Sequence, residues 1–85
     1  MKTMYKTKDF HTAAFMLACG EVKFHGVEPH ESDPKALAFV FSPKKLCERL
    51  ELDFIGGTAM VNARTYANAM RQAKDAIYAK ERINH

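Results

Sequence analysis

The chain has 85 residues, a formal net charge of +3 and 47% hydrophobic residues, so it can bury one small core and is too apolar for an intrinsically disordered protein. It contains no run near the roughly 18 apolar residues of a membrane span, and its first ten residues lack the apolar region of a signal peptide. We therefore expect a single domain over residues 1–85, located in the cytoplasm and not in a membrane. Thirteen Lys and Arg against ten Asp and Glu permit an anionic partner without requiring one.

The first quarter of the chain predicts a short strand and a helix. Residues 3–7 alternate weakly, as a short edge strand does. Thr7 or Asp9 then offers a side-chain cap for a helix that runs to Cys19. Gly20 ends this helix, because glycine adopts a positive φ without strain. Apolar residues at helical spacing form its buried face, which Phe15 and Met16 widen: Phe10, Ala13, Ala14, Leu17 and Ala18.

Two strands follow the first helix. Residues 22–25 alternate between apolar and polar side chains, which is the period of a half-buried strand. Residues 30–34 contain turn formers, and residues 35–42 form a continuous apolar run that is typical of a central strand. We expect an antiparallel hairpin in which Phe39 and Phe41 share one face.

The remaining elements are two helices and a short strand. Ser42 is a good N-cap, and Pro43 suits the first helical position, where no N–H is needed. Residues 59–61 are a candidate last strand, and Asn62 caps a final helix that ends near Ile83. The predicted order is β-α-β-β-α-(β)-α, an α+β fold with a short antiparallel sheet packed by three helices. This order agrees with a ferredoxin-like split βαβ unit carrying an added C-terminal helix.

Three stretches resemble a family of small uncharacterised domains from phages, prophages and bacteria. Residues 5–20 begin with Tyr-x-Thr-Lys-Asp and continue as an Ala-rich helix ending in Gly. Residues 39–41 form a Phe-Val-Phe strand, and residues 61–78 match a closing Val-Asn/Asp-x-x-x-Tyr-Ala helix. The resemblance implies a source in a mobile element, a location in a bacterial host cell and a role that need not be enzymatic.

The residues offer little for catalysis. Neither Cys19 nor Cys47 has a partner for activation nearby in the sequence or belongs to a C-x-x-C pair, so we expect reduced buried thiols, with a disulfide as the alternative. Zinc needs three or four converging ligands, and the polar segment 25–33 matches no standard spacing of such ligands. Its candidate ligands are His25, Glu28, His30, Glu31 and Asp33. We expect no enzymatic activity, no cofactor and no metal.

Basic residues stand near the predicted starts of all three helices. Acidic residues are favoured there by about 0.3–1 kcal/mol each, so local stability does not explain the pattern. Helix N-termini bind phosphates and carboxylates, and adjacent cations strengthen such a site. The sequence therefore predicts a non-enzymatic binding module that contacts nucleic acid, nucleoprotein or another anionic partner. The candidate residues are Lys6, Lys8, Lys44, Lys45, Arg64 and Arg71.

Two other functions remain open from the sequence. The domain is an inhibitor of a bacterial host defence or regulatory protein if Phe54, Ile55 and Met60 form an exposed apolar patch. Alternatively, it is a self-assembling homodimer, in which the apolar first helix and the Ala-rich last helix pack between two copies.

Overall fold

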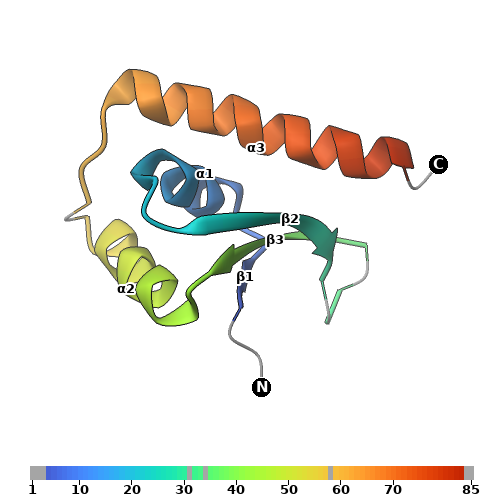
Figure 1. Cartoon of the computed structure of the whole chain (residues 1–85), viewed down its shortest axis with the longest axis horizontal. Helices are drawn as coiled ribbons and strands as arrows, with labels where there is room; N and C mark the ends of the chain where they lie inside the picture. The colour runs from blue at the N-terminus through green and yellow to red at the C-terminus, as the bar shows by residue number, and fades with distance from the viewer. Residues whose placement is uncertain (1–3, 31, 34, 58, 84–85) are drawn as a thin grey trace.

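The computed structural model describes residues 4–83 except residues 31, 34 and 58. Figure 1 shows α3 crossing α1 on one side of the sheet and α2 at one end of it. The result is a small α+β domain of the predicted element order. Its elements are β1 (Tyr5–Thr7), α1 (Phe10–Cys19), β2 (Lys23–Pro29), β3 (Leu37–Ser42), α2 (Lys44–Ile55) and α3 (Ala63–Ile83).

β3 is the central strand of a three-stranded sheet with the order β1-β3-β2, and both neighbours are antiparallel to it. Tyr5 of β1 and Phe24 of β2 lie opposite Phe41 from either side. The pairing of β2 with β3 shifts between Phe24 and Gly26, where Gly26 has a φ of 113° that a residue with a Cβ rarely adopts. The predicted hairpin is therefore confirmed. The predicted short N-terminal strand is also confirmed. Its first predicted residue, residue 3, lies outside the described residues.

One face of the sheet carries the core. Phe39 and Phe41 of β3 and Tyr5 of β1 are buried there, because alternate residues of a strand point to the same side. All three helices complete the same cluster, through Ala13, Phe15, Met16, Cys47, Leu50 and Ala73. Because α1 also packs against α3, its run from Thr12 to Met16 is buried without interruption.

The opposite face of the sheet is polar at both edges. Lys6 of β1 lies opposite Val40, and Glu28 of β2 lies opposite Ala38. Lys6 and Glu28 form an ion pair that crosses the central strand. Ala38 and Val40, the cross-strand neighbours of Glu28 and Lys6, are both buried.

Both ends of α1 carry the expected caps. The Asp9 carboxylate accepts hydrogen bonds from the Thr12 backbone N–H, at 3.0 Å, and from the Thr12 hydroxyl. Thr7, the other predicted cap, instead accepts from the Asp9 backbone N–H with its hydroxyl oxygen at 3.1 Å. At the other end Gly20 has a φ of 69°, so the predicted glycine stop is confirmed.

The start of α2 differs from the prediction. Ser42 is the last residue of β3, paired with Lys23, and its Oγ is hydrogen-bonded to His25 Nε2 at 2.7 Å. Pro43 is the N-cap and makes no side-chain capping bond, so α2 begins at Lys44. The predicted Ser42 cap is wrong, because strand pairing and the His25 contact hold Ser42 in the sheet.

The predicted strand at residues 59–61 is also absent from the described structure. The backbone N–H of Ala59 donates to the carbonyl of Asp53 at 3.1 Å, which turns this segment back onto the end of α2 and away from β1. Asn62 then caps α3 as predicted, since its Oδ1 accepts from the N–H groups of Arg64 and Thr65 at 2.9 and 3.2 Å. The sheet thus has the order and directions of the first three strands of a ferredoxin-like unit, and α3 follows in the chain where such a unit has its fourth strand.

Candidate functional site

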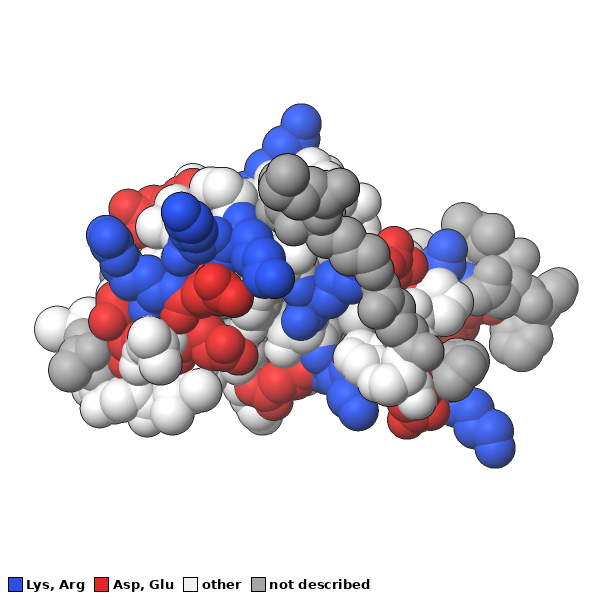
Figure 2. Space-filling view, turned by 90° about the horizontal axis from the view of Figure 1, so that it is seen from below, with Lys and Arg blue, Asp and Glu red and all other residues white. Residues whose placement is uncertain are grey.

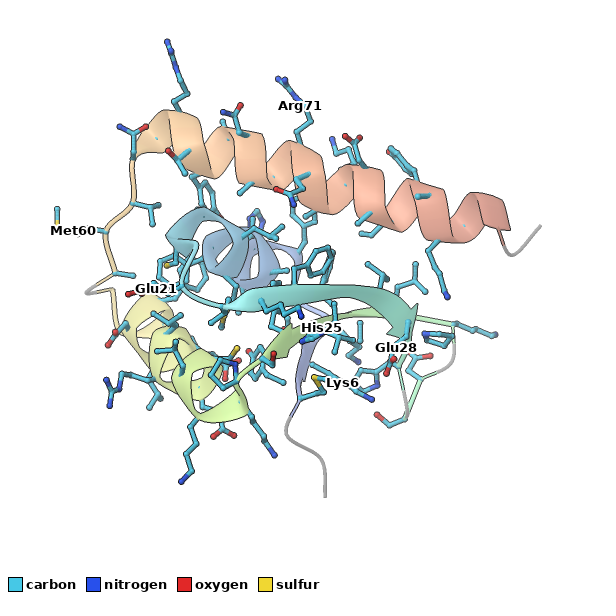
Figure 3. All side chains as sticks on the ribbon, in the orientation of Figure 1. Lys6, Glu21, His25, Glu28, Met60 and Arg71 are labelled. Carbon is cyan, nitrogen blue, oxygen red and sulfur yellow. The ribbon has the colours of Figure 1, made fainter. Side chains whose placement is uncertain are left out.

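The basic residues predicted to bind an anion lie on different sides of the molecule. In Figure 3, Arg71 points away from the body on the α3 side, whereas Lys6 lies on the other side of the sheet. The six residues therefore do not share one face. They lie on β1 (Lys6), before α1 (Lys8), in the first turn of α2 (Lys44 and Lys45) and on α3 (Arg64 and Arg71).

Two of the predicted residues, Lys6 and Lys44, meet at one cavity. It has a volume of about 380 Å³ and lies between β1, the first turns of α2 and the loop after β2. We call it the β1–α2 cavity, and its lining residues are Met4, Tyr5, Lys6, His30, Ser32, Lys44 and Glu48. A second cavity, of about 330 Å³, lies between the start of α1 and α3, and its lining includes Arg71.

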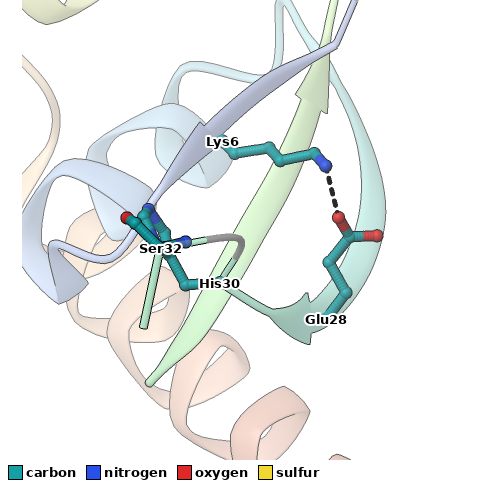
Figure 4. Close-up of polar contacts among 4 residues, drawn as sticks. All are labelled: Lys6, Glu28, His30 and Ser32. Carbon is teal, nitrogen blue, oxygen red and sulfur yellow. Dashed lines mark hydrogen bonds and ion pairs between the residues drawn. The ribbon is translucent and has the colours of Figure 1, made fainter. Parts of the chain in front are cut away.

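The polar contacts at the β1–α2 cavity reduce its positive charge. The ammonium group of Lys6 is 2.5 Å from a carboxylate oxygen of Glu28 (Figure 4). In the same view, His30 and Ser32 lie beside each other, and His30 Nδ1 accepts from the Ser32 backbone N–H at 3.2 Å. Glu48 lines the cavity together with Lys44. The cavity therefore combines cations with carboxylates and is not strongly basic.

The charges along α2 oppose the helix dipole at both ends. Its first turn carries Lys44 and Lys45 and contains no acidic residue, and its last turn contains no basic residue. Glu48, Glu51 and Asp53 follow further along the helix, and two of them lie in its second half. Anions are favoured at helix N-termini and cations at C-termini, so this distribution reduces the stability of α2. In the space-filling view of the lower face, Lys and Arg side chains lie directly beside Asp and Glu at the end where α2 lies (Figure 2).

One partly buried hydrogen bond connects α2 to the sheet. The Tyr5 hydroxyl donates to Glu51 Oε2 at 2.7 Å. Burial, and then the hydrogen bond to the Glu51 carboxylate, raise the pKa of Tyr5 far above its ordinary value. The hydroxyl therefore stays protonated, and the bond joins an edge strand to the middle of α2.

Large apolar side chains are exposed at the end of α2 and in the following loop. Leu52 and Ile55 are each 71% exposed, Met60 is 93% exposed and Val61 is 36% exposed; we call these four residues the apolar patch. Leu52 and Ile55 are three residues apart and lie next to each other on the helix surface. In Figure 3, Met60 extends from the loop between α2 and α3 away from the body of the domain.

The apolar patch lacks one residue of the predicted set and contains two others. Ile55 and Met60 are exposed as that prediction required, but Phe54 is half-buried and stacks on Phe15, with ring centroids 5.1 Å apart. Sequence reasoning missed Leu52 and Val61. The signal for Leu52 was present, because a residue two positions after a buried helical residue, here Leu50, lies about 200° around the helix.

The helix expected to form a homodimer is already covered. Residues 12–16 of α1 are buried within the domain, and α1 packs against α3 of the same chain. The exposed side of α3 is largely polar, although Tyr78 is 52% exposed on it. The homodimer through α1 and α3 stays a prediction.

The described residues contain no group of three or more His, Cys, Asp and Glu side chains placed to hold a metal ion. Of the residues considered for such a site, His25 contacts Ser42, while Glu31 lies outside the described residues. Cys19 and Cys47 are free thiols, and burial raises the pKa of both above the ordinary value, which disfavours the reactive thiolate. In the described part of the chain, no helix is long and apolar enough to cross a membrane.

Comparison with known families places the chain in one of them. The model of the family described as Domain of unknown function (DUF5659) matches residues 2–79. Since this match covers nearly the whole chain, the protein belongs to that family. Comparison with curated proteins and with solved structures found no significant match.

Proposed function

We propose that this member of the family is a non-enzymatic protein-binding module that contacts its partner through the apolar patch. Six large apolar side chains are exposed among the described residues, and four of them lie within residues 52–61. Apolar side chains scattered singly over a surface are ordinary, whereas a group of them marks an interaction site. This grouping is the observation that carries the proposal.

Three features of α2 support the same function. The helix lacks a side-chain cap, its charges oppose its dipole at both ends, and two of its exposed positions are Leu52 and Ile55. Each of these features costs stability or solubility within the isolated domain. Binding of a partner protein over this helix would explain all three unfavourable features.

The partner that we propose is a bacterial host protein in a defence or regulatory complex. Support comes from the resemblance of residues 5–20, 39–41 and 61–78 to small domains of phages and prophages. A small module acting in the cytoplasm of a host cell has no need of catalysis if it inhibits by covering a surface. Shape and apolar contact then provide its affinity.

A capture experiment with matched variants tests this function. The immobilised chain and its Leu52→Ser/Ile55→Ser/Met60→Ser variant are exposed to bacterial lysate, and captured proteins are cross-linked and mapped. The control is Met4→Ser/Tyr78→Ser, which removes exposed apolar side chains elsewhere. We expect a protein that is captured by the wild type and the control, cross-links within residues 48–61 and is lost with the triple variant. Equal capture by the triple variant, or no capture at all, would contradict the proposal.

A second candidate function is anion binding at the β1–α2 cavity, in which a nucleic acid or nucleoprotein is the partner. The observation in its favour is that Lys6 and Lys44 line one cavity at the start of a helix without a side-chain cap. Glu28 and Glu48 offset these charges, so we rank this function below protein binding. Any contact of this kind involves the phosphate backbone and weakens with salt.

The second candidate is tested by titrating short single- and double-stranded nucleic acids at low and moderate salt. A Lys6→Ser/Lys44→Ser variant removes the cavity cations, and Arg71→Ser/Lys74→Ser removes two cations at the other cavity as the control. Salt-sensitive binding that only the first variant abolishes supports the cavity. Absence of binding at low salt removes nucleic acid from consideration.

A further inference from the structure

We propose that the apolar patch receives a positively charged amphipathic helix of the partner protein. This inference rests on the proposed protein-binding function and adds the chemical class of the contacting segment. Two properties of the surface carry it: the backbone of α2 offers no pairing edge, and the residues around the patch are mainly acidic.

The backbone of α2 favours a helical partner segment. Leu52 and Ile55 belong to α2, whose backbone groups are bonded within the helix, and the N–H groups of Gly56 and Ala59 donate to carbonyls of α2 at 2.8 and 3.1 Å. A strand-like partner needs a free row of N–H and C=O groups to pair with. This surface offers side chains only. The partner segment must therefore satisfy its own backbone hydrogen bonds, as a helix does.

The charges near the apolar patch favour a cationic partner segment. Residues 48–55 contain three carboxylates and one cation, Arg49, although the whole chain has a net charge of +3. Glu48 and Arg49 both lie about one helical turn before Leu52. Glu51 lies one turn before Ile55 and also accepts the hydrogen bond from Tyr5. The C-terminus of α2 adds negative partial charge, and no basic residue occupies its last turn. The carboxylates that surround the patch form what we call the acidic rim: Glu21, Glu48, Glu51 and Asp53.

Glu21 reaches this region from another element. It follows the end of α1, and α1 packs against α2. In Figure 3, Glu21 lies beside the C-terminal end of α2. Its carboxylate and that of Asp53 raise the pKa of the Cys19 thiol, after the larger effect of burial. The acidic rim therefore extends across two elements, and its field acts on any segment seated over the patch.

The same charges disfavour a membrane. An apolar patch that binds lipid headgroups needs surrounding Lys and Arg to attract anionic lipids. Here the rim repels such a surface, so vesicles serve as one arm of the test and not as a second proposal.

The test uses the full chain and three synthetic 18-residue helices that share one leucine face and carry Lys, Gln or Glu on the polar face. Binding is measured by fluorescence anisotropy at 50 and 300 mM NaCl. We expect the Lys helix to bind most tightly and to weaken with salt. The affinity of the Lys helix for the Glu21→Gln/Glu48→Gln variant should be about three- to tenfold lower than for the wild type, as expected when two exposed charge pairs are removed. The control Asp75→Asn/Glu81→Gln removes two exposed charges from α3 and keeps the wild-type affinity.

The outcomes separate this inference from the proposed function. If all three helices bind equally and Leu52→Ser/Ile55→Ser abolishes binding, the patch is confirmed and its preference for cations is refuted. If the Lys helix binds the Leu52→Ser/Ile55→Ser variant as it binds the wild type, the patch is not the contact. Failure of the Lys helix to bind better than the Gln helix also overturns the inference, as does tighter binding to anionic lipid vesicles.

Discussion

α1 and α2 have similar lengths, 10 and 12 residues, but they differ in almost every other respect. α1 has a carboxylate cap at its start, a glycine in the left-handed conformation at its end and five consecutive buried residues. α2 has no side-chain cap, charges that oppose its dipole and only two buried residues. Leu52 and Ile55 of α2 are more exposed than any residue in the centre of α1.

The difference predicts separate roles for the two helices, in stability for α1 and in binding for the outside of α2. Local interactions and burial at α1 both favour the folded state, so α1 contributes to stability. At α2 the inward residues Cys47 and Leu50 anchor the helix, while its outward residues are unfavourable for an isolated domain. Substitutions in α1 should therefore change folding, and substitutions on the outside of α2 should change binding.

The largest expected effect comes from matched truncations in the two helices. Phe15 is 3% exposed and stacks on Phe54, so Phe15→Ala should lower the free energy of unfolding by about 3–5 kcal/mol. Leu52→Ala removes an exposed side chain and should change it by less than about 0.5 kcal/mol. Urea denaturation followed by circular dichroism measures both. Similar losses of stability in the two variants would refute the predicted difference between the two helices.

The second prediction concerns the hydrogen bond that joins α2 to β1. The pKa of Tyr5 is raised in the folded state, so above its unfolded value of about 10 only the unfolded chain loses this proton. Stability from Tyr5 is complete below that pH and falls by about 1.4 kcal/mol per pH unit above it. We expect Tyr5→Phe to make the alkaline decrease less steep in urea denaturation between pH 8 and 11.

The matched control for the pH experiment is Tyr78→Phe, which removes an exposed hydroxyl on α3. Its alkaline decrease should follow that of the wild type. A Tyr5→Phe variant with the wild-type slope would show that the Tyr5–Glu51 bond does not control this titration.

The third prediction tests the difference in capping. Asp9→Ala removes the carboxylate that accepts from Thr12 and should destabilise the domain by about 1 kcal/mol. Ser42→Ala at the corresponding end of α2 removes no cap, because Ser42 contacts His25, and should cost less than about 0.5 kcal/mol. Thermal unfolding of both variants measures the difference. A larger loss at Ser42 would mean that the sequence-based cap assignment was the better one.

The smallest effect is an expected gain. Lys45→Glu places a carboxylate in the first turn of α2 and one turn before Arg49, so it should stabilise the domain by about 0.5 kcal/mol at low salt. Lys45→Gln, which only removes the charge, should give a smaller gain. The benefit should shrink at 1 M NaCl because salt screens exposed charges. A destabilising Lys45→Glu would show that Lys45 contributes to folding in a way that the dipole does not describe.

The sequence predicted the parts of the fold that depend on neighbouring residues. Asp9, Gly20 and Asn62 act within a few positions along the chain, and all three were identified as helix ends. Ser42 was misassigned because its partner, His25, lies on another strand. The segment 59–61 was taken as a strand, although the bond that positions it runs to α2. Tertiary contacts of this kind leave no local pattern.

The candidate site was predictable to a smaller extent. Exposure of Ile55 and Met60 followed from their positions at the end of a helix and in a loop. The meeting of Lys6 and Lys44 at one cavity depends on how β1 packs beside α2, and the pairing of Lys6 with Glu28 depends on the strand register. Neither appears in the spacing of the residues.

The bulge in β2 has a consequence for aggregation. β2 is an edge strand of seven residues, and such an edge can template pairing with another chain. The bulge between Phe24 and Gly26 twists this edge, Lys23 places a charge at one end, and Pro29 lacks an N–H at the other. This edge of the sheet is thereby made a poor template for pairing with another chain.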